Sequence, residues 1–273
     1  SEKTPLYSPC LFGDYVSQEI SRTDLFLKST DDYERKGIKT VFGSSVREID
    51  PDLRKISHDK GEIQYDTLVL ATGSEALLPP IPGLDKQGVL PIKTIQNLTD
   101  LMNCLTNIQK EKPVVVIGSG AIGIEMAVSI KKRGFSVILI EQLPRILPKL
   151  LDPKAARFLN KILVKNNIQI MTNEKVTAIV GEKQVAGIET NSHSIPCELV
   201  ILAVGMRPRT ELAQKAELQL GPHQGIEVNE MMQTNVPNIY ACGDCVEAKN
   251  VITGNKDLSL LWHQAKHQGF IAG

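Results

Sequence analysis

The sequence lacks long apolar runs, an excess of charge of either sign, and any signal-peptide pattern. No apolar stretch approaches the roughly 20 residues that a membrane-spanning helix needs. The 31 basic and 31 acidic residues cancel, and this balance argues against nucleic acid or an acidic membrane surface as a partner. We therefore expect a chain with no membrane span and no nucleic-acid partner.

The sequence also has few cysteines, no low-complexity tract and no short repeat. An odd, scattered set of cysteines is not the framework of a disulfide-rich secreted protein, so we expect a reducing, cytoplasmic setting. The 273 residues suffice for one large or two medium domains. The five cysteines are Cys10, Cys104, Cys197, Cys242 and Cys245.

A glycine-rich turn between two apolar segments is the most informative motif. Residues 113–118 (PVVVIG) are typical of a strand buried on both faces of a parallel sheet. In the G-x-G-x-x-G that follows, Gly118 permits a tight turn, Gly120 lets the backbone approach a pyrophosphate, and Gly123 lets helix and strand pack closely. A helix from about Ile122 would direct its first amides at the phosphates. The pattern predicts a dinucleotide site, against the alternative of a merely tight strand–helix turn.

An acid ends the next apolar segment. Glu141 closes the predicted strand SVILIE and follows Gly118 by 23 positions, close to the spacing of an acid that hydrogen-bonds a ribose 2′-hydroxyl. Such a carboxylate would repel a 2′-phosphate, so the sequence favours NADH over NADPH. The alternative is a solvated charge at a strand end.

Further segments complete an alternating α/β pattern. Asp152 and Pro153 are typical of a helix start. The predicted helix then carries one apolar face, formed by Ala156, Leu159, Ile162 and Leu163. Two strand–glycine stretches echo each other, at 65–74 (YDTLVLATGS) and 198–208 (ELVILAVGMRP). A third, at 238–245 (NIYACGDC), leads into Gly243 and Asp244, where a cofactor hydroxyl could be bound. The echo suggests two similar nucleotide-binding domains.

Taken together, these motifs resemble the pyridine nucleotide–disulfide oxidoreductases, in particular the branch of NADH oxidases, coenzyme A-disulfide reductases and rubredoxin reductase-like enzymes. Their order and spacing match the family along essentially the whole chain. The matching motifs are YSPC (7–10), ATGS (71–74), GSGAIGIE (118–125), VGMRP (204–208) and ACGD (241–244).

The resemblance implies an α/β fold with two Rossmann-like three-layer nucleotide-binding domains, in which an NAD domain is inserted in an FAD domain. The implied domains are residues 1–105 and 226–273 for FAD and 106–225 for NAD. The FAD domain is incomplete, because the family's N-terminal glycine fingerprint and its C-terminal interface domain have no counterpart here. We therefore expect this segment alone to hold FAD weakly or not at all. The resemblance allows for a homodimer in a full-length protein.

The resemblance also assigns site residues. It implies that the backbone at Val46 meets the FAD adenine. Glu125 lies near the nicotinamide, or is a solvated helix charge. The implied cofactors are FAD and NAD, and no metal is implied. The cofactor-binding residues are Gly118, Gly120, Ile122, Gly123, Glu125, Glu141, Gly205, Val46, Ala71, Thr72, Gly73, Gly243 and Asp244.

Cys10 falls where single-cysteine members of the family carry a redox-active thiol, which could cycle between thiolate and sulfenic acid or mixed disulfide. The alternative is a small buried apolar residue. The implied function is a flavin-dependent oxidoreductase that passes hydride from NAD(P)H, with NADH preferred, to FAD and on to an unknown electron acceptor. Oxygen, a disulfide and an electron-carrier protein are the candidate acceptors. A nucleotide-binding core without catalysis is the alternative function.

Overall fold

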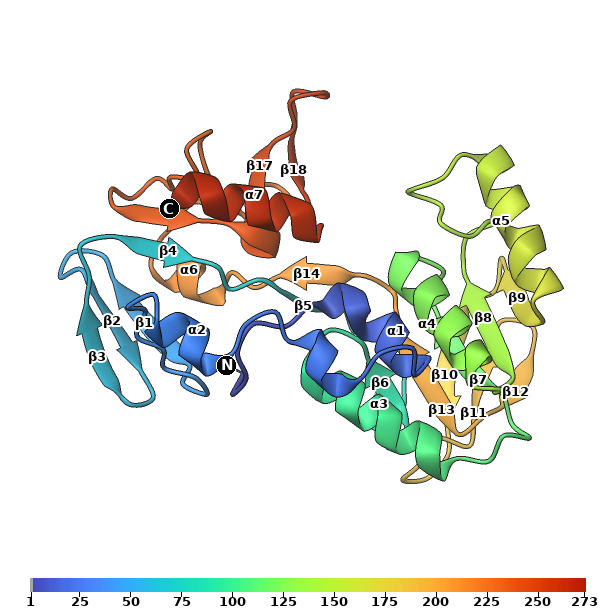
Figure 1. Cartoon of the computed structure of the whole chain (residues 1–273). Coiled ribbons are helices and arrows are strands. Elements are labelled where there is room, and N and C mark those ends of the chain that lie inside the picture. The colour runs from blue at the N-terminus through green and yellow to red at the C-terminus, as the bar shows by residue number, and fades with distance from the viewer. Residues whose placement is uncertain (1) are drawn as a thin grey trace. The chain divides into compact units, whose positions relative to one another are not determined.

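The computed structural model describes residues 2–273, which form two compact units. The first unit contains the described residues up to Leu6, together with Lys28–Glu75 and Met206–Gly273. The second contains Tyr7–Leu27 and Ala76–Gly205. Figure 1 traces the chain through the elements of both units. In this described part, no helix has the length and apolar character needed to cross a membrane.

A five-stranded parallel sheet forms the centre of the second unit, with the order β6-β13-β7-β8-β9. β7 and β8 are buried along their whole length, as the apolar runs predicted. β7 lies between β13 and β8. The turn after β7 therefore lies at a topological switch point of the sheet. The strands are β6 (Val89–Pro91), β13 (Leu199–Leu202), β7 (Val114–Ile117), β8 (Val137–Glu141) and β9 (Ile168–Thr172).

Alternating side chains of this sheet enter two separate cores. Val114 and Val116 face a core shared with the helices, whereas Val115 and Ile117 face a core shared with a small antiparallel sheet. The alternation follows from the two-residue period of a strand. The result is three layers of helices, parallel sheet and antiparallel sheet. The antiparallel strands are β10 (Val176–Val180), β11 (Gly187–Thr190) and β12 (Ser194–Pro196).

The helical layer is set by local sequence signals. Asp152 accepts hydrogen bonds from the first amides of α5, with Pro153 at the first helical position, which confirms the predicted helix start. Thr94 caps α3 in the same way, as part of a capping box. The elements of this layer are η1 (Pro9–Leu11), α1 (Phe12–Val16), η2 (Arg22–Leu25), α3 (Ile95–Asn107), α4 (Ala121–Lys132) and α5 (Pro153–Lys165).

The first unit is built from smaller sheets around its own apolar core. β4 pairs in parallel with β16, although about 170 residues separate them in the sequence. This pairing brings the Ala-Thr-Gly and Gly-Asp motifs to the same end of the two strands. The strands are β1 (Val46–Asp50), β2 (Lys55–His58), β3 (Gly61–Gln64), β4 (Leu68–Leu70), β15 (Ile226–Glu227), β16 (Ile239–Ala241), β17 (Val246–Lys249) and β18 (Lys256–Leu258). The helices are α2 (Thr30–Glu34), α6 (Glu211–Lys215), η3 (Gly243–Cys245) and α7 (Trp262–Ala272).

The boundaries of the compact units differ from the expected 105/106 and 225/226. The chain passes between the units in β5 (Ser74–Ala76) and β14 (Met206–Pro208), which pair with each other. β6 belongs to the second unit because it adds an edge strand to β13. The segment Tyr7–Leu27 belongs there too, because Phe12, Val16 and Leu25 are buried in the helical core. The α/β class and the Rossmann-like parallel sheet are confirmed.

Candidate functional site

The glycine turn after β7 has the geometry that its sequence predicted. Gly118 has a φ of 101°, and a Cβ there would collide with the carbonyl oxygen of Ala203. A Cβ on Gly123 would collide with the carbonyl oxygen of Gly118, at the closest approach of helix and strand. By contrast, no atom lies within 4 Å of a Cβ built on Gly120. Gly118 and Gly123 are therefore required by packing, whereas Gly120 faces open space.

The first turn of α4 begins directly at this space. Gly120 is the N-cap residue, and no side chain caps the helix. The first amides of an α-helix have no partner within the helix, so the amides near Ile122 can bind an anion. Ile122 itself is partly buried against the helical core, which fixes the start of the helix.

Glu141 lies at the end of β8 and is 8% exposed. Its Oε2 accepts hydrogen bonds from the Ser119 amide (3.0 Å) and the Ser119 hydroxyl (2.7 Å). Its Oε1 accepts one from the Leu143 amide (2.9 Å). The carboxylate thus holds the glycine turn in place, and it retains acceptor capacity on Oε1 because each carboxylate oxygen can accept more than one hydrogen bond. It is not a solvated strand-end charge.

The turn after β9, which the sequence analysis did not single out, lies beside Glu141. The amides of Asn173 and Glu174 donate to the carbonyls of Leu143 (3.1 Å) and Glu141 (3.0 Å). Glu174 is itself 7% exposed. These bonds tie the turn after β9 to the loop that follows the acid of β8.

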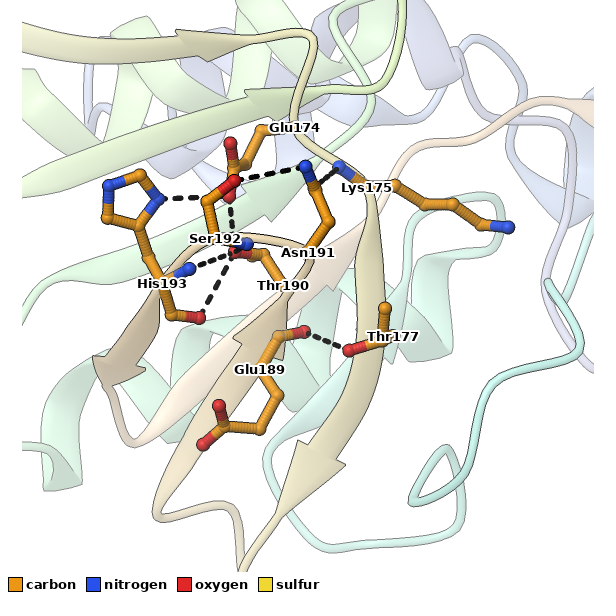
Figure 2. A network of polar contacts seen from close by, with 8 residues as sticks. All are labelled: Glu174, Lys175, Thr177, Glu189, Thr190, Asn191, Ser192 and His193. Carbon is orange, nitrogen blue, oxygen red and sulfur yellow. Dashed lines mark hydrogen bonds and ion pairs between the residues drawn. The ribbon is translucent and has the colours of Figure 1, made fainter.

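Glu174 is held by the polar cluster in Figure 2, where its side chain meets Thr190 and His193 from the turn between β11 and β12. The Thr190 hydroxyl donates to Glu174 Oε1, and His193 Nδ1 lies 2.9 Å from the same oxygen. The Thr190 hydrogen bond is the main cause that lowers the pKa of Glu174, and His193 adds to it. The Lys175 amide donates to Asn191 Oδ1 at 2.7 Å. This cluster anchors the turn after β9. In the sequence, only the polar composition of two turns indicates it.

Glu125 on α4 contacts the segment that carries Cys10. Its Oε1 accepts a hydrogen bond from the Gly13 amide at 3.2 Å. Burial is the main cause that raises the pKa of Glu125, the Gly13 hydrogen bond opposes this rise, and the nearby Asp14 adds to it. Glu125 is therefore not a solvated helix charge. Cys10 lies in η1 with its side chain exposed, so it is not a buried packing residue in this structure.

In the first unit, the Ala-Thr-Gly and Gly-Asp motifs meet at the ends of β4 and β16. Gly73 has a φ of 70° and its carbonyl accepts from the Arg209 amide, while the Thr72 hydroxyl donates to the Arg209 carbonyl (2.6 Å). Asp244 Oδ2 accepts a hydrogen bond of 2.7 Å from the Ser74 hydroxyl. These hydrogen bonds fix the Ala-Thr-Gly motif, the backbone at Arg209 and the Asp244 side chain to one another within this unit.

The remaining assigned residues of this unit occupy turns and strand ends. Gly243 has a φ of 82°, and its amide donates to Gln268 Oε1 of α7 at 2.8 Å. Ala71 is exposed directly after β4. Val46 begins β1 and packs partly against the core of the first unit. Whether its backbone meets an adenine stays a prediction.

Gly205, the last residue of the second unit, has a φ of 121°. A Cβ built there would have no atom within 4 Å. Its carbonyl accepts a hydrogen bond from the Leu77 amide. The open space beside this backbone is compatible with a ligand contact.

The Cys242-x-x-Cys245 pair has no metal-site geometry. Burial raises the pKa of both thiols, and the Cys245 Sγ lies 3.3 Å from the Cys242 carbonyl oxygen. Within residues 2–273, no group of three or more candidate ligands could hold a metal ion. The two thiols are packing groups beside the Gly-Asp motif.

The chain belongs to the pyridine nucleotide-disulphide oxidoreductase family, whose pattern it matches over residues 1–269. Members of this family are flavin-dependent oxidoreductases that use NAD(P)H.

Two relatives and one solved structure illustrate the range of similarity. The chain is 39% identical to the NADH oxidase of Methanocaldococcus jannaschii, over 100% of this chain and 62% of that protein. It is 36% identical to the assimilatory nitrate reductase electron transfer subunit of Bacillus subtilis, over 93% of this chain and 33% of that protein. The NAD-dependent persulfide reductase from A. fulgidus superposes with a TM-score of 0.94 at 28% identity, over 99% of this chain and 52% of that one. The chain thus spans less than two thirds of each of these three proteins.

Proposed function

We propose that this chain is the nucleotide-binding core of a flavin-dependent oxidoreductase that takes hydride from NADH. The glycine turn carries the proposal. The open space over Gly120, beside the buried carboxylate of Glu141, suits a pyrophosphate and a ribose with a free 2′-hydroxyl. Membership of a family of such enzymes supports the same reaction class.

In this proposal the second unit binds NADH. The first amides of α4 and the backbone at Gly120 bind the pyrophosphate. Glu141 Oε1 accepts a hydrogen bond from the ribose 2′-hydroxyl, while Oε2 keeps Ser119 in place. A 2′-phosphate would bring a second negative charge to this carboxylate, so NADH is preferred over NADPH.

The first unit contributes to FAD binding. Asp244, oriented by Ser74, accepts hydrogen bonds from hydroxyl groups of the cofactor. The turns at Gly73 and Gly243 allow close backbone approach because both residues have positive φ. These residues would hold FAD, which would supply the electron-transfer chemistry between NADH and the acceptor, while the protein supplies position and electrostatics.

The electron acceptor that we propose contains sulfur. The relatives are named for an oxidase, an electron-transfer subunit and a persulfide reductase. The exposed thiol of Cys10 favours a sulfur acceptor, because a thiolate can form a mixed disulfide with such a substrate. The Glu125 contact to Gly13 holds the backbone three residues after this thiol. Oxygen and a carrier protein are the alternatives.

The test is NADH binding by the 273-residue chain and by two matched glycine variants. Gly120→Val places a branched side chain in the space proposed for the pyrophosphate, and its Cβ has no protein atom within 4 Å. We expect it to weaken NADH binding by about a hundredfold or more, because a branched side chain blocks the phosphate contacts. Gly269→Val, on α7, is the control, since a Cβ there also meets open space.

Circular dichroism spectra and thermal midpoints of both variants should match the parent. The proposal fails if Gly120→Val keeps the parent's NADH affinity while folded, or if the parent shows no saturable NADH binding.

A further inference from the structure

Glu174 is a buried acid that has no part in the proposed nucleotide contacts. It follows β9 in the second unit and is 7% exposed. Burying a carboxylate costs free energy unless hydrogen bonds compensate it. The Thr190 hydroxyl donates to its Oε1, and His193 Nδ1 lies 2.9 Å from the same oxygen (Figure 2). The carboxylate is therefore held by the turn between β11 and β12.

The backbone of the same turn reaches the end of β8. Asn173 has a φ of 57°, in the left-handed region that asparagine tolerates better than most residues, and the chain turns sharply there. The Asn173 amide donates to the Leu143 carbonyl (3.1 Å), and the Glu174 amide donates to the Glu141 carbonyl (3.0 Å). The turn after β9 is thus bound on one side through a side chain and on the other through its amides.

Leu143 connects this turn to the carboxylate of Glu141. The Leu143 carbonyl accepts from the Asn173 amide, and the Leu143 amide donates to Glu141 Oε1 at 2.9 Å. The other oxygen of that carboxylate is bound by Ser119. Oε1 is the oxygen that the proposed function assigns to the ribose. The place of the Leu143 amide therefore sets the direction of the acceptor capacity that Oε1 keeps for a ligand.

The turn after β9 has a second attachment that does not use the Glu174 carboxylate. The Lys175 amide donates to Asn191 Oδ1 (2.7 Å), and the Asn191 amide donates to the Lys175 carbonyl (3.0 Å). These two bonds remain when the partners of Glu174 are changed. A variant that removes the hydroxyl of Thr190 should therefore loosen the position of Glu174 without unfolding the turn.

We propose that Glu174 is a positioning residue for the nucleotide, because it holds the turn after β9 against Leu143 and thereby directs Glu141 Oε1 at the ribose 2′-hydroxyl. Glu174 acts through Glu141 and does not itself contact the nucleotide. This inference rests on the proposed function, which assigns the ribose contact to Glu141. Loss of the positioning should weaken NADH binding more than NADPH binding, because the hydrogen bond from the 2′-hydroxyl is lost while the repulsion of a 2′-phosphate remains.

The test compares three threonine variants of the 273-residue chain. Thr190→Val removes the hydroxyl that donates to Glu174, whereas Thr190→Ser keeps a hydroxyl there. Thr177→Val is the matched control, because its hydroxyl donates to a carbonyl of the same small sheet, away from Glu174. NADH and NADPH are titrated at a temperature well below every thermal midpoint, so that each variant is folded.

We expect Thr190→Val to weaken NADH binding by about threefold to tenfold and to lower the ratio of NADH to NADPH affinity. Thr190→Ser and Thr177→Val should stay within about twofold of the parent. Glu174→Ala, which removes the whole carboxylate, should weaken NADH binding at least as much as Thr190→Val. A residue that only stabilised the fold would lower the thermal midpoint and leave the ratio unchanged.

Amide hydrogen exchange, measured by NMR without nucleotide, follows the same contacts independently. In Thr190→Val the Leu143 amide should exchange about tenfold faster than in the parent, because a local opening that exposes it becomes easier. The Val115 amide in β7 should exchange at the parent's rate. Equal acceleration of both amides would indicate a global loss of stability and would overturn the positioning role.

The proposal is also overturned if folded Thr190→Val binds NADH like the parent, or if Thr190→Ser loses as much affinity as Thr190→Val. The variant Glu141→Ala separates the two levels of the argument. If it weakens NADH binding while Thr190→Val does not, the proposed function stands and the role of Glu174 fails. If the parent binds no NADH, the proposed function fails as well.

Discussion

At the scale of single residues, the role that we propose for Glu141 links the fold to the choice of nucleotide. We expect Glu141→Ala to weaken NADH binding about tenfold, because a charge-assisted hydrogen bond to the ribose is lost. Binding of NADPH should weaken less or improve, because the charge that repels its phosphate is removed. Parallel titrations with both nucleotides measure the ratio of affinities. An unchanged ratio would remove Glu141 from the ribose site.

The variant Glu141→Ala also removes the bonds that hold Ser119, so a structural loss must be separated from a binding loss. Ser119→Ala removes one of those bonds and leaves the carboxylate in place. It should lower the thermal midpoint without changing the NADH/NADPH ratio. If both variants change the ratio equally, the effect comes from a disturbed turn.

Glu125 gives a prediction for pH dependence. Burial raises its pKa above the ordinary value of 4.5, so the folded state holds the proton more tightly than the unfolded state. The sign follows from linkage: the contribution of Glu125 to stability is full below the unfolded pKa and is lost as pH rises through the folded pKa. We expect Glu125→Gln, which still accepts from Gly13, to lack this loss. Thermal midpoints of the two proteins should diverge as pH rises from about 4.5, and parallel curves would contradict the prediction.

At the scale of secondary-structure elements, the glycines between β7 and α4 have different roles: some are required by packing, and one is proposed to bind the nucleotide. Gly123→Ala places a methyl group against the Gly118 carbonyl oxygen. We expect a loss of about 1–3 kcal/mol in the free energy of unfolding, typical of overpacking at a site that cannot relax. Gly120→Ala should lose much less, because its Cβ meets open space. Urea denaturation measures both, and equal losses would show that the turn deforms easily.

The turn after β9 is held in place through one buried hydrogen-bond acceptor, the carboxylate of Glu174. Thr190→Val removes the hydroxyl that donates to Glu174 while keeping the side-chain volume. We expect a lower thermal midpoint than for Thr177→Val, whose hydroxyl donates to a carbonyl at the exposed surface. The penalty should shrink as pH falls through the lowered pKa of Glu174, since a paired carboxylate stabilises the fold only while ionised. Equal midpoints for both variants would contradict the anchoring role.

The sequence predicted these elements unevenly, for physical reasons. The helix expected from about Ile122 begins at Ala121, because glycine spacing and apolar periodicity are local signals. The expected apolar face of α5 is right for Ala156 and Leu163, but Ile162 is 40% exposed, since periodicity does not show how wide a face the neighbours cover. The contact of Glu174 with Thr190 joins two polar turns, which carry no periodic signal.

At the scale of the whole molecule, composition and motif order predicted the α/β class, whereas the bounds of the compact units depend on pairing between distant strands. β6 has only three residues, and its place in the sheet is set by β13, about 110 residues later in the chain. The boundary after Glu75 falls inside β5, which pairs with β14, and has no linker composition. Long-range pairing decides both features, and local patterns do not report it.

The electron acceptor is a property of the whole protein. A substitution at Cys10 tests whether that acceptor contains sulfur. In a flavin-loaded protein containing this chain, we expect Cys10→Ser to lower NADH-dependent reduction of a disulfide or persulfide by about tenfold or more, because serine cannot form the mixed disulfide. Reduction of ferricyanide, which needs no thiol, should be unchanged. Cys104→Ser is the control, since Cys104 lies within α3 and burial raises its pKa. If Cys10→Ser leaves sulfur reduction intact, Cys10 does not form the mixed disulfide, and a stopped-flow comparison of oxygen, a carrier protein and the sulfur acceptor then identifies which reoxidises the reduced protein fastest.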